Sequence, residues 1–203
     1  MKNTIKWFDL KITIPYVIGQ LSEKKVNSIL ETLQKNGFRN VTLVMANINA
    51  AAITLSPEGK NLLIEPQKIC FSCHLNGIFN PVSIQAEYES ILNSLLIDDQ
   101  NQYLISIEGI EETANSHTES KYIFEKNFKD LDEEVYGVGY RFLIKNKRLF
   151  GELKIEPYIS DYTKYFYHWL LNKSENGTIA EMLHDVQTEL QKERTGCYSV
   201  IRR

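Results

Sequence analysis

Strand and helix patterns occur twice along this 203-residue chain, in the same order each time. An alternating segment at residues 4–14, which places Phe8 and Leu10 on one side, is followed by an amphipathic helix, several short strands and a second helix. Residues 103–172 repeat this order in a shorter form. Because alternation with a period of two is typical of a strand with one buried face, we expect each half to combine sheet and helix.

The two helices of the first half have recognisable N-termini. Ser22 is a favourable N-cap, and Gly37 can end that helix in a left-handed turn. The second helix begins at Asn80, whose side chain can also serve as a cap. Leu30 and Leu95 each belong to an apolar stripe with helical spacing, so we expect both to anchor the core.

The second half is expected to begin with a strand that includes Tyr103–Ile107 and a helix introduced by the capping-box spacing of Ser116–Glu119. Two longer strands and then two helices follow. The strands are predicted at residues 134–144 and 148–156. Ser160 is interpreted as the cap of an aromatic helix, and the capping box at Thr178–Glu181 begins a C-terminal helix. The apolar stripe of this last helix should dock on its own chain or on a second copy, which would make it a dimer interface. The stripe consists of Ile179, Met182, Leu183, Val186 and Leu190.

These elements predict an α+β protein in which an antiparallel sheet has helices on one face. We interpret the chain as two related strand–helix–strands–helix halves, residues 1–99 and 100–173, followed by a C-terminal helix and tail at 174–203. In topology alone this order resembles the helix-grip and TATA-binding-protein-like folds. A shared topology does not by itself imply a function.

Composition and charge limit the function classes. No apolar run is long enough for a transmembrane helix, and Lys6, Asp9 and Lys11 interrupt any hydrophobic segment near the N-terminus. Three cysteines in such a chain are typical of reduced thiols, so we expect a cytoplasmic protein. The net charge of −3 disfavours a dominant nucleic-acid role, which normally requires a basic surface.

The segment Cys70–His74 has the spacing of a c-type haem attachment site. However, residues 69–75 alternate like a strand, and on a strand Cys70 and Cys73 point to opposite faces. A zinc site would need further ligands, and the third cysteine, Cys197, has no close partner in sequence. We therefore expect no haem, metal or other cofactor.

Gly137 and Gly139 lie in the predicted strand at 134–144 and would leave a flat surface beside Arg141. That guanidinium could be simply solvated, or it could bind a carboxylate or phosphate through two hydrogen bonds. With Tyr140 and Glu108, Arg141 forms the candidate ligand-binding set.

The sequence contains no motif typical of common hydrolases or nucleotide-binding enzymes, so we assign no catalytic residue. The leading hypothesis is a non-enzymatic binding or interaction protein that self-associates and whose ligand is unknown. The alternative is a small-molecule enzyme with a pocket between the sheet and the helices, lined by the candidate set. Aromatic residues at 162–169, near Lys164 and Lys173, make nucleic-acid binding a weaker alternative.

Overall fold

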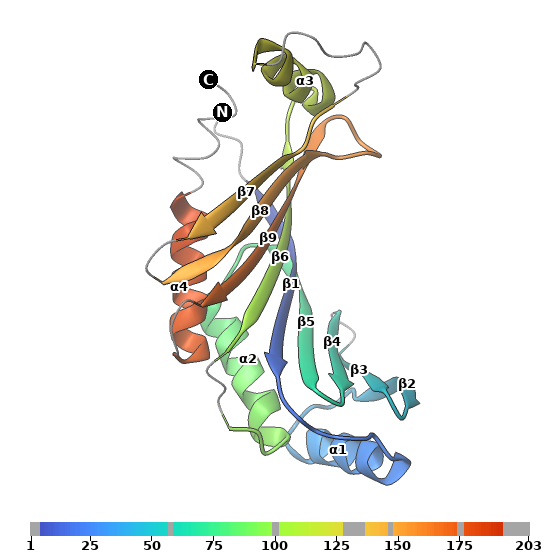
Figure 1. Cartoon of the computed structure of the whole chain (residues 1–203). Coiled ribbons are helices and arrows are strands. Elements are labelled where there is room, and N and C mark those ends of the chain that lie inside the picture. Colours follow the sequence, from blue (N-terminus) through green and yellow to red (C-terminus); the bar gives the residue numbers. More distant parts are fainter. Residues whose placement is uncertain are drawn as a thin grey trace.

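The computed structural model describes residues 5–56, 59–98, 102–127, 137–145, 148–173 and 177–192 (Figure 1). In these residues, nine strands form one antiparallel sheet and four helices accompany it, which confirms the predicted α+β class. The strand order is β2-β3-β4-β5-β1-β6-β9-β8-β7. In chain order the elements are β1 (Lys6–Pro15), α1 (Glu23–Lys35), β2 (Thr42–Asn47), β3 (Ala50–Ser56), β4 (Lys60–Glu65), β5 (Lys68–Gly77), α2 (Pro81–Ser94), β6 (Leu104–Glu112), α3 (Ser116–Asn127), β7 (Tyr140–Lys145), β8 (Leu149–Pro157), β9 (Lys164–Lys173) and α4 (Ile179–Lys192).

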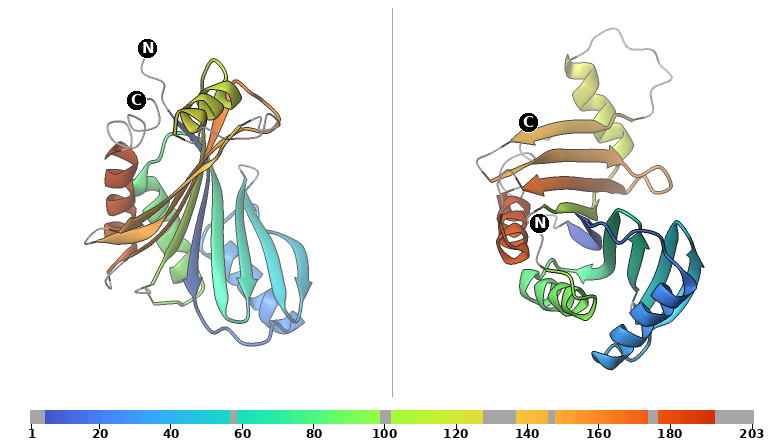
Figure 2. Two further views of the ribbon diagram at one scale, coloured as in Figure 1. Left: turned by 45° about the horizontal axis from the view of Figure 1, so that its top comes forward. Right: turned by 60° about the horizontal axis from the view of Figure 1, so that its bottom comes forward.

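The helices α1, α2 and α4 lie on the same side of the twisted sheet (Figures 1 and 2). The last two pack against each other, α1 lies below β2, and α3 lies at the opposite end of the molecule beside β8. The strands β1 and β6 pair at the centre of the sheet, so the sheet continues across the predicted boundary at residues 99 and 100. We call the side of the sheet without these three helices the open face.

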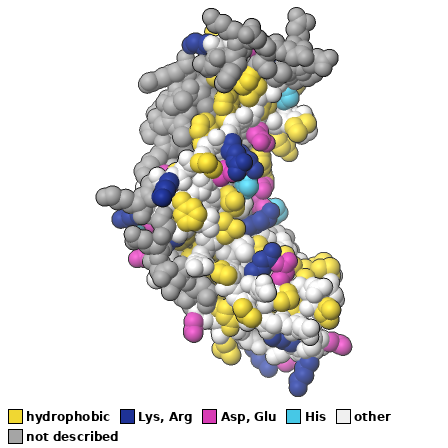
Figure 3. All heavy atoms as spheres, in the orientation of Figure 1, with side chains coloured by type: hydrophobic (Ala, Val, Ile, Leu, Met, Phe, Trp, Pro, Cys, Tyr) yellow, Lys and Arg dark blue, Asp and Glu magenta, His cyan; other side chains and the backbone are white. Residues whose placement is uncertain are grey.

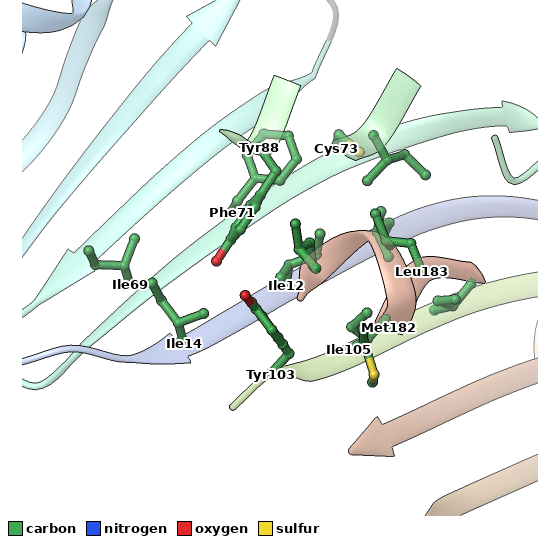
Figure 4. Packing of buried hydrophobic residues seen from close by; sticks show 14 of the residues in the cluster. Ile12, Ile14, Ile69, Phe71, Cys73, Tyr88, Tyr103, Ile105, Met182 and Leu183 are labelled. Atoms are coloured by element: carbon green, nitrogen blue, oxygen red, sulfur yellow. The ribbon is translucent and has the colours of Figure 1, made fainter. Parts of the chain in front are cut away.

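The core lies between the sheet and the helices that cover it (Figure 4). Ile12 of β1 is paired with Phe71 of β5 on one side and with Ile105 of β6 on the other, and all three side chains are buried. Met182 and Leu183 of α4 are completely buried on the same side of the sheet. Since every second residue of the central strands joins this layer, the residues between them are directed to the open face.

A β-bulge between Trp7 and Asp9 interrupts the alternation of β1, which the sequence pattern did not indicate. Relative to β6, this strand has one extra residue, so Trp7 is buried together with Leu10, whereas Phe8 is only half-buried. The predicted placement of Phe8 beside Leu10 in the core is therefore wrong. The indole of Trp7 lies over Gly109, where a Cβ atom would come within 2.5 Å of the ring, so this position requires glycine.

The aromatic segment that we predicted as a helix beginning at Ser160 is the strand β9, so this prediction is wrong. Tyr165, Tyr167, Trp169 and Leu171 alternate with less buried residues, which is the period of a strand. Nine consecutive residue pairs connect this strand to β6, and a second ladder connects it to β8. Pairing with a neighbouring strand on both sides stabilises this segment as a strand more than the burial of one apolar face would stabilise it as a helix.

The predicted helices at 22–37, 80–95 and 178–193 correspond to α1, α2 and α4, and the helix predicted from Ser116 corresponds to α3. The Ser22 hydroxyl accepts a hydrogen bond from the backbone of Lys25, and the Asn80 side chain accepts one from Ser83. All five residues of the predicted C-terminal stripe are buried within their own chain, where α4 packs against the sheet and α2.

The deepest leucines of α1 and α2 are not the two that the sequence indicated. Leu30 and Leu95 are only partly buried at the margin of the core, whereas Leu33 and Leu92 are almost fully enclosed. The apolar stripe of α1 is therefore centred on Leu33, three residues after the predicted anchor, and that of α2 on Leu92, three residues before it.

This difference can be measured with two matched variants in α1. Leu33→Ala should reduce the free energy of unfolding by about 2–5 kcal/mol, because it leaves a cavity in an enclosed site. Leu30→Ala should cost only about 1–2 kcal/mol, since part of that side chain is already in contact with water. Urea unfolding of both variants measures the difference, and equal losses would contradict the placement of the core.

Candidate binding surface on the open face

A row of charged and titratable residues crosses the open face, with one residue from each of six neighbouring strands. Cross-strand pairing places each member directly opposite the next. In Figure 3 basic, acidic and histidine side chains lie close together across the middle of this face. We call this set the polar row; from β7 to β5 it consists of Arg141, Lys154, His168, Glu108, Asp9 and His74.

The basic end of the polar row is organised by Glu152, which lies on β8 two residues before Lys154. The Arg141 guanidinium forms an ion pair with the Glu152 carboxylate, and Lys154 Nζ lies 3.2 Å from the same group. Burial acts to raise the pKa of Glu152, but the hydrogen bonds from Arg141 and Lys154 outweigh it and hold the pKa below its ordinary value. One carboxylate therefore positions two cations, of which Arg141 remains largely exposed.

The centre of the row contains a serine–histidine pair. Ser106 Oγ on β6 and His168 Nε2 on β9 share a hydrogen bond of 2.9 Å. Burial lowers the pKa of His168, Glu108 acts to raise it, and Lys154 acts to lower it. The net effect is a lowered pKa, which favours the neutral imidazole.

The acidic end of the row is organised by Asp9, which is partly buried on β1. Lys11 Nζ and His74 Nδ1 each lie 3.7 Å from one of its carboxylate oxygens. His74 Nδ1 is also 3.3 Å from the backbone oxygen of Phe8. The imidazole of His74 packs so closely on Gly59 that a Cβ atom there would clash with it.

Aromatic side chains border the polar row at its centre. The ring of Phe166 on β9 lies 6.4 Å from Phe8, 6.3 Å from Tyr158 and 6.5 Å from His168, measured between ring centroids. We call Phe8, Tyr158 and Phe166 the aromatic group. On the other side of the row, Leu143 of β7 is exposed and apolar, so the row lies between two apolar zones.

A groove of about 990 Å³ lies at one end of the sheet, where β1 and β4 end and β6 begins. Its walls include Pro15, Gln67, Lys68 and Gln102, and the half-exposed ring of Phe150. Phe150 is paired with Lys145 on β7, so it belongs to the open face. The groove therefore adds a concave site at the edge of the open face.

The structure brings together two of the three predicted ligand-binding residues. Arg141 and Glu108 both belong to the polar row, three strand spacings apart, which is about 14 Å. Tyr140 points to the opposite face, where its ring stacks on Phe142 and its hydroxyl donates a hydrogen bond of 3.4 Å to the Ser120 carbonyl. Burial raises the pKa of Tyr140.

The surroundings of the two glycines differ from the sequence prediction. Gly137 and Gly139 precede β7 rather than lying within it, and residues 134–136 of the predicted strand are outside the described residues. A Cβ atom on Gly137 would come within 3.2 Å of Pro157 and 3.3 Å of Ser120. This glycine permits a close approach of the chain to α3 and β8.

Sequence reasoning missed Lys154, His168, Asp9 and His74 as members of one surface. Each occupies the outward position of its strand, which the period of two can indicate. Their alignment, however, depends on the register of five strand pairs, and no short sequence motif encodes that register.

The two cysteines of the CxxCH segment point to opposite faces of β5, as predicted. Cys73 is buried in the core with Phe71, whereas Cys70 is partly exposed on the open face. Burial raises the pKa of the Cys73 thiol to about 12. Among the described residues, no group of three or more histidine, cysteine, aspartate or glutamate side chains is arranged to hold a metal ion, and Cys197 lies outside them.

The two thiols should therefore differ in reactivity. Iodoacetamide at pH 8 should modify Cys70 at least about tenfold faster than Cys73 in the native protein, because the reactive species is the thiolate and Cys73 is both buried and protonated. Peptide mass spectrometry measures both rates. In guanidinium chloride the two rates should become similar, and equal rates in the native protein would contradict the assigned faces of β5.

No protein-family model matches this sequence, and no curated protein is significantly similar to it. Among the helices in the described part of the chain, none combines the length and the hydropathy needed to cross a membrane.

Proposed function

We propose that this protein is a non-enzymatic binding protein whose open face engages another protein. The observation that carries this proposal is the polar row, which lies between two apolar zones on a sheet face that α1, α2 and α4 leave uncovered. A surface that combines exposed aromatic side chains with ordered charges has the composition of a protein–protein interface.

The charges of the polar row favour a protein partner over a nucleic acid. Arg141 and Lys154 are basic at one end, whereas Glu108 and Asp9, which precede His74 at the other end, are acidic. A nucleic acid would meet two carboxylates at this surface, although it requires a predominantly basic one. A partner that presents both signs in the opposite order would match the row, and such complementarity fixes the orientation of two proteins.

The apolar zones supply the contacts that would provide most of the affinity. Phe150 and the aromatic group present rings at the surface. Interfaces gain most of their binding energy from a few aromatic or arginine side chains that become buried in pockets. The groove beside Phe150 can receive such a side chain from the partner.

The proposal can be tested with a photo-crosslinking amino acid in place of Phe150, with Tyr122 on α3 as a matched exposed position away from the open face. We expect a protein adduct from position 150 and none from position 122. The captured partner, once purified, should bind the wild-type protein directly, and Arg141→Glu combined with Lys154→Glu should weaken that binding by about tenfold or more.

A control variant separates the position of the charges from the change in net charge. Lys24→Glu combined with Lys35→Glu on α1 alters the net charge by the same amount and should leave binding unchanged. Equal weakening by the two double variants, or an adduct with RNA alone at position 150, would contradict the proposal.

A small-molecule enzyme is the second candidate, and the serine–histidine pair on the open face favours it. A neutral imidazole bonded to a hydroxyl can act as a general base and activate that hydroxyl as a nucleophile. Glu108 is paired with His168 across the strands and acts to raise its pKa. Ser106, His168 and Glu108 would then perform acyl transfer on a small ester.

This candidate is tested by hydrolysis of p-nitrophenyl acetate. If it holds, Ser106→Ala should reduce the rate by about 100-fold or more, whereas Ser72→Ala, at an outward position of β5, should have no effect. Because the lowered pKa of His168 keeps the imidazole neutral, activity should be lost only as the pH falls below the ordinary histidine value. Equal rates for wild type and Ser106→Ala would exclude the acyl-transfer role.

We also propose that the two halves of the chain derive from a duplication, in the helix-grip or TATA-binding-protein-like manner. The second half predicted at residues 100–173 has no closing helix, because the segment after Ser160 is the strand β9. If α4 is counted with this half instead, the element order supports a duplication: β1, α1, four further strands and α2 correspond to β6, α3, three further strands and α4. In each half the last strand lies next to the first, and the two first strands meet at the centre.

A further inference from the structure

The edge strand β2 is exposed along its whole length. All six of its residues are exposed, and they include Leu43, Val44 and Met45; Ile48 follows in the turn to β3. The exposed fractions of these four side chains are 38%, 68%, 47% and 63%. An exposed apolar edge strand presents unpaired backbone groups to which another strand can bind.

The exposed side chains of β2 lie on both faces of the sheet. A β-bulge between Leu43 and Met45 makes Val44 an extra residue relative to β3. Leu43, opposite the buried Ile53, therefore lies on the helix side, whereas Met45, opposite Ala52, lies on the open face. A helix or loop docking on one face would cover only one of these side chains. An added strand would neighbour both of them and would also pair with the backbone of the edge.

The two edges of the sheet differ in charge. Strand β2 has no charged residue, whereas β7 at the other edge has Arg141 and Lys145. Two copies of β7 would bring like charges together, and basic residues on an edge are a common protection against pairing. Two copies of β2 meet no such repulsion, so this edge can pair with itself.

We infer that β2 is a self-association surface, where β2 of a second copy pairs in the antiparallel direction about a two-fold axis. The nine-stranded sheet would then continue from one subunit into the other. This interface replaces the one predicted on α4, whose apolar stripe is buried within the chain. A six-residue strand forms a small interface, so we expect a dimer with micromolar affinity.

The test compares the molar mass of the wild-type chain with that of charged variants at Val44. Sedimentation equilibrium at up to 200 µM should give twice the 23.5 kDa chain mass for the wild type. Val44→Glu and Val44→Lys should each raise the dimer dissociation constant by about tenfold or more, because two like charges are then brought into one small apolar interface. An equimolar mixture of the two variants should recover the dimer.

Controls separate this edge from the rest of the protein. Leu143→Glu, at an 80% exposed position of the opposite edge strand, should leave the molar mass unchanged. The melting temperature of the dilute protein should be unaltered in every variant, since these side chains are already in contact with water.

Hydrogen exchange of the wild-type protein is an independent measurement that needs no variant. The amides of Thr42–Asn47 should gain protection as the concentration rises. A wild-type mass of one chain at 200 µM, or a dimer in which these amides exchange at an unchanged rate, would overturn the inference.

Discussion

The antiparallel pairing of β1 with β6 is the interaction on which the rest of the structure depends. It joins the two halves at the centre of the sheet, and both strands direct buried isoleucines towards the helices, Ile12 and Ile14 from β1 and Ile105 and Ile107 from β6. Ile12 lies opposite Ile105, and Leu10 lies opposite Ile107, so the register that buries one strand also buries the other. A slip of one residue between them would turn the buried side chains of the strand that slips to the open face.

The same register determines which side chains lie next to each other on the open face. Because Asp9 lies opposite Glu108 and Glu108 opposite His168, the charges of three strands are aligned by pairing that the core requires. The proposed binding surface therefore needs little separate organisation, apart from the ion pairs that Glu152 and Asp9 form with their neighbours. Such a surface can change its charges by substitution without disturbing the packing behind it.

The sequence predicted those elements whose signals are local. Ser22 and Asn80 identify helix N-termini because a cap acts within one turn, and the alternation around Cys70 and Cys73 correctly separates their faces. β9 was mistaken for a helix because Phe166 and Leu170, on its open face, are apolar and conceal the period of two. The polar row and the exposure of β2 depend on the order of strands in the sheet, and that order is a property of the whole chain.

The β-bulge in β1 allows a side chain to be added to the open face without removing the neighbouring residues from the core. Phe8 is the extra residue relative to β6, and its neighbours Trp7 and Leu10 are both buried. Without Phe8, the remaining residues would alternate regularly, with Trp7 and Leu10 inward and Asp9 outward. The extra residue relative to β6 therefore places a phenyl ring beside Phe166 on the open face, while Trp7 and Leu10 stay in the core. One extra residue in a strand can thus add a side chain to the surface of a sheet while the residues on either side of it stay in the core.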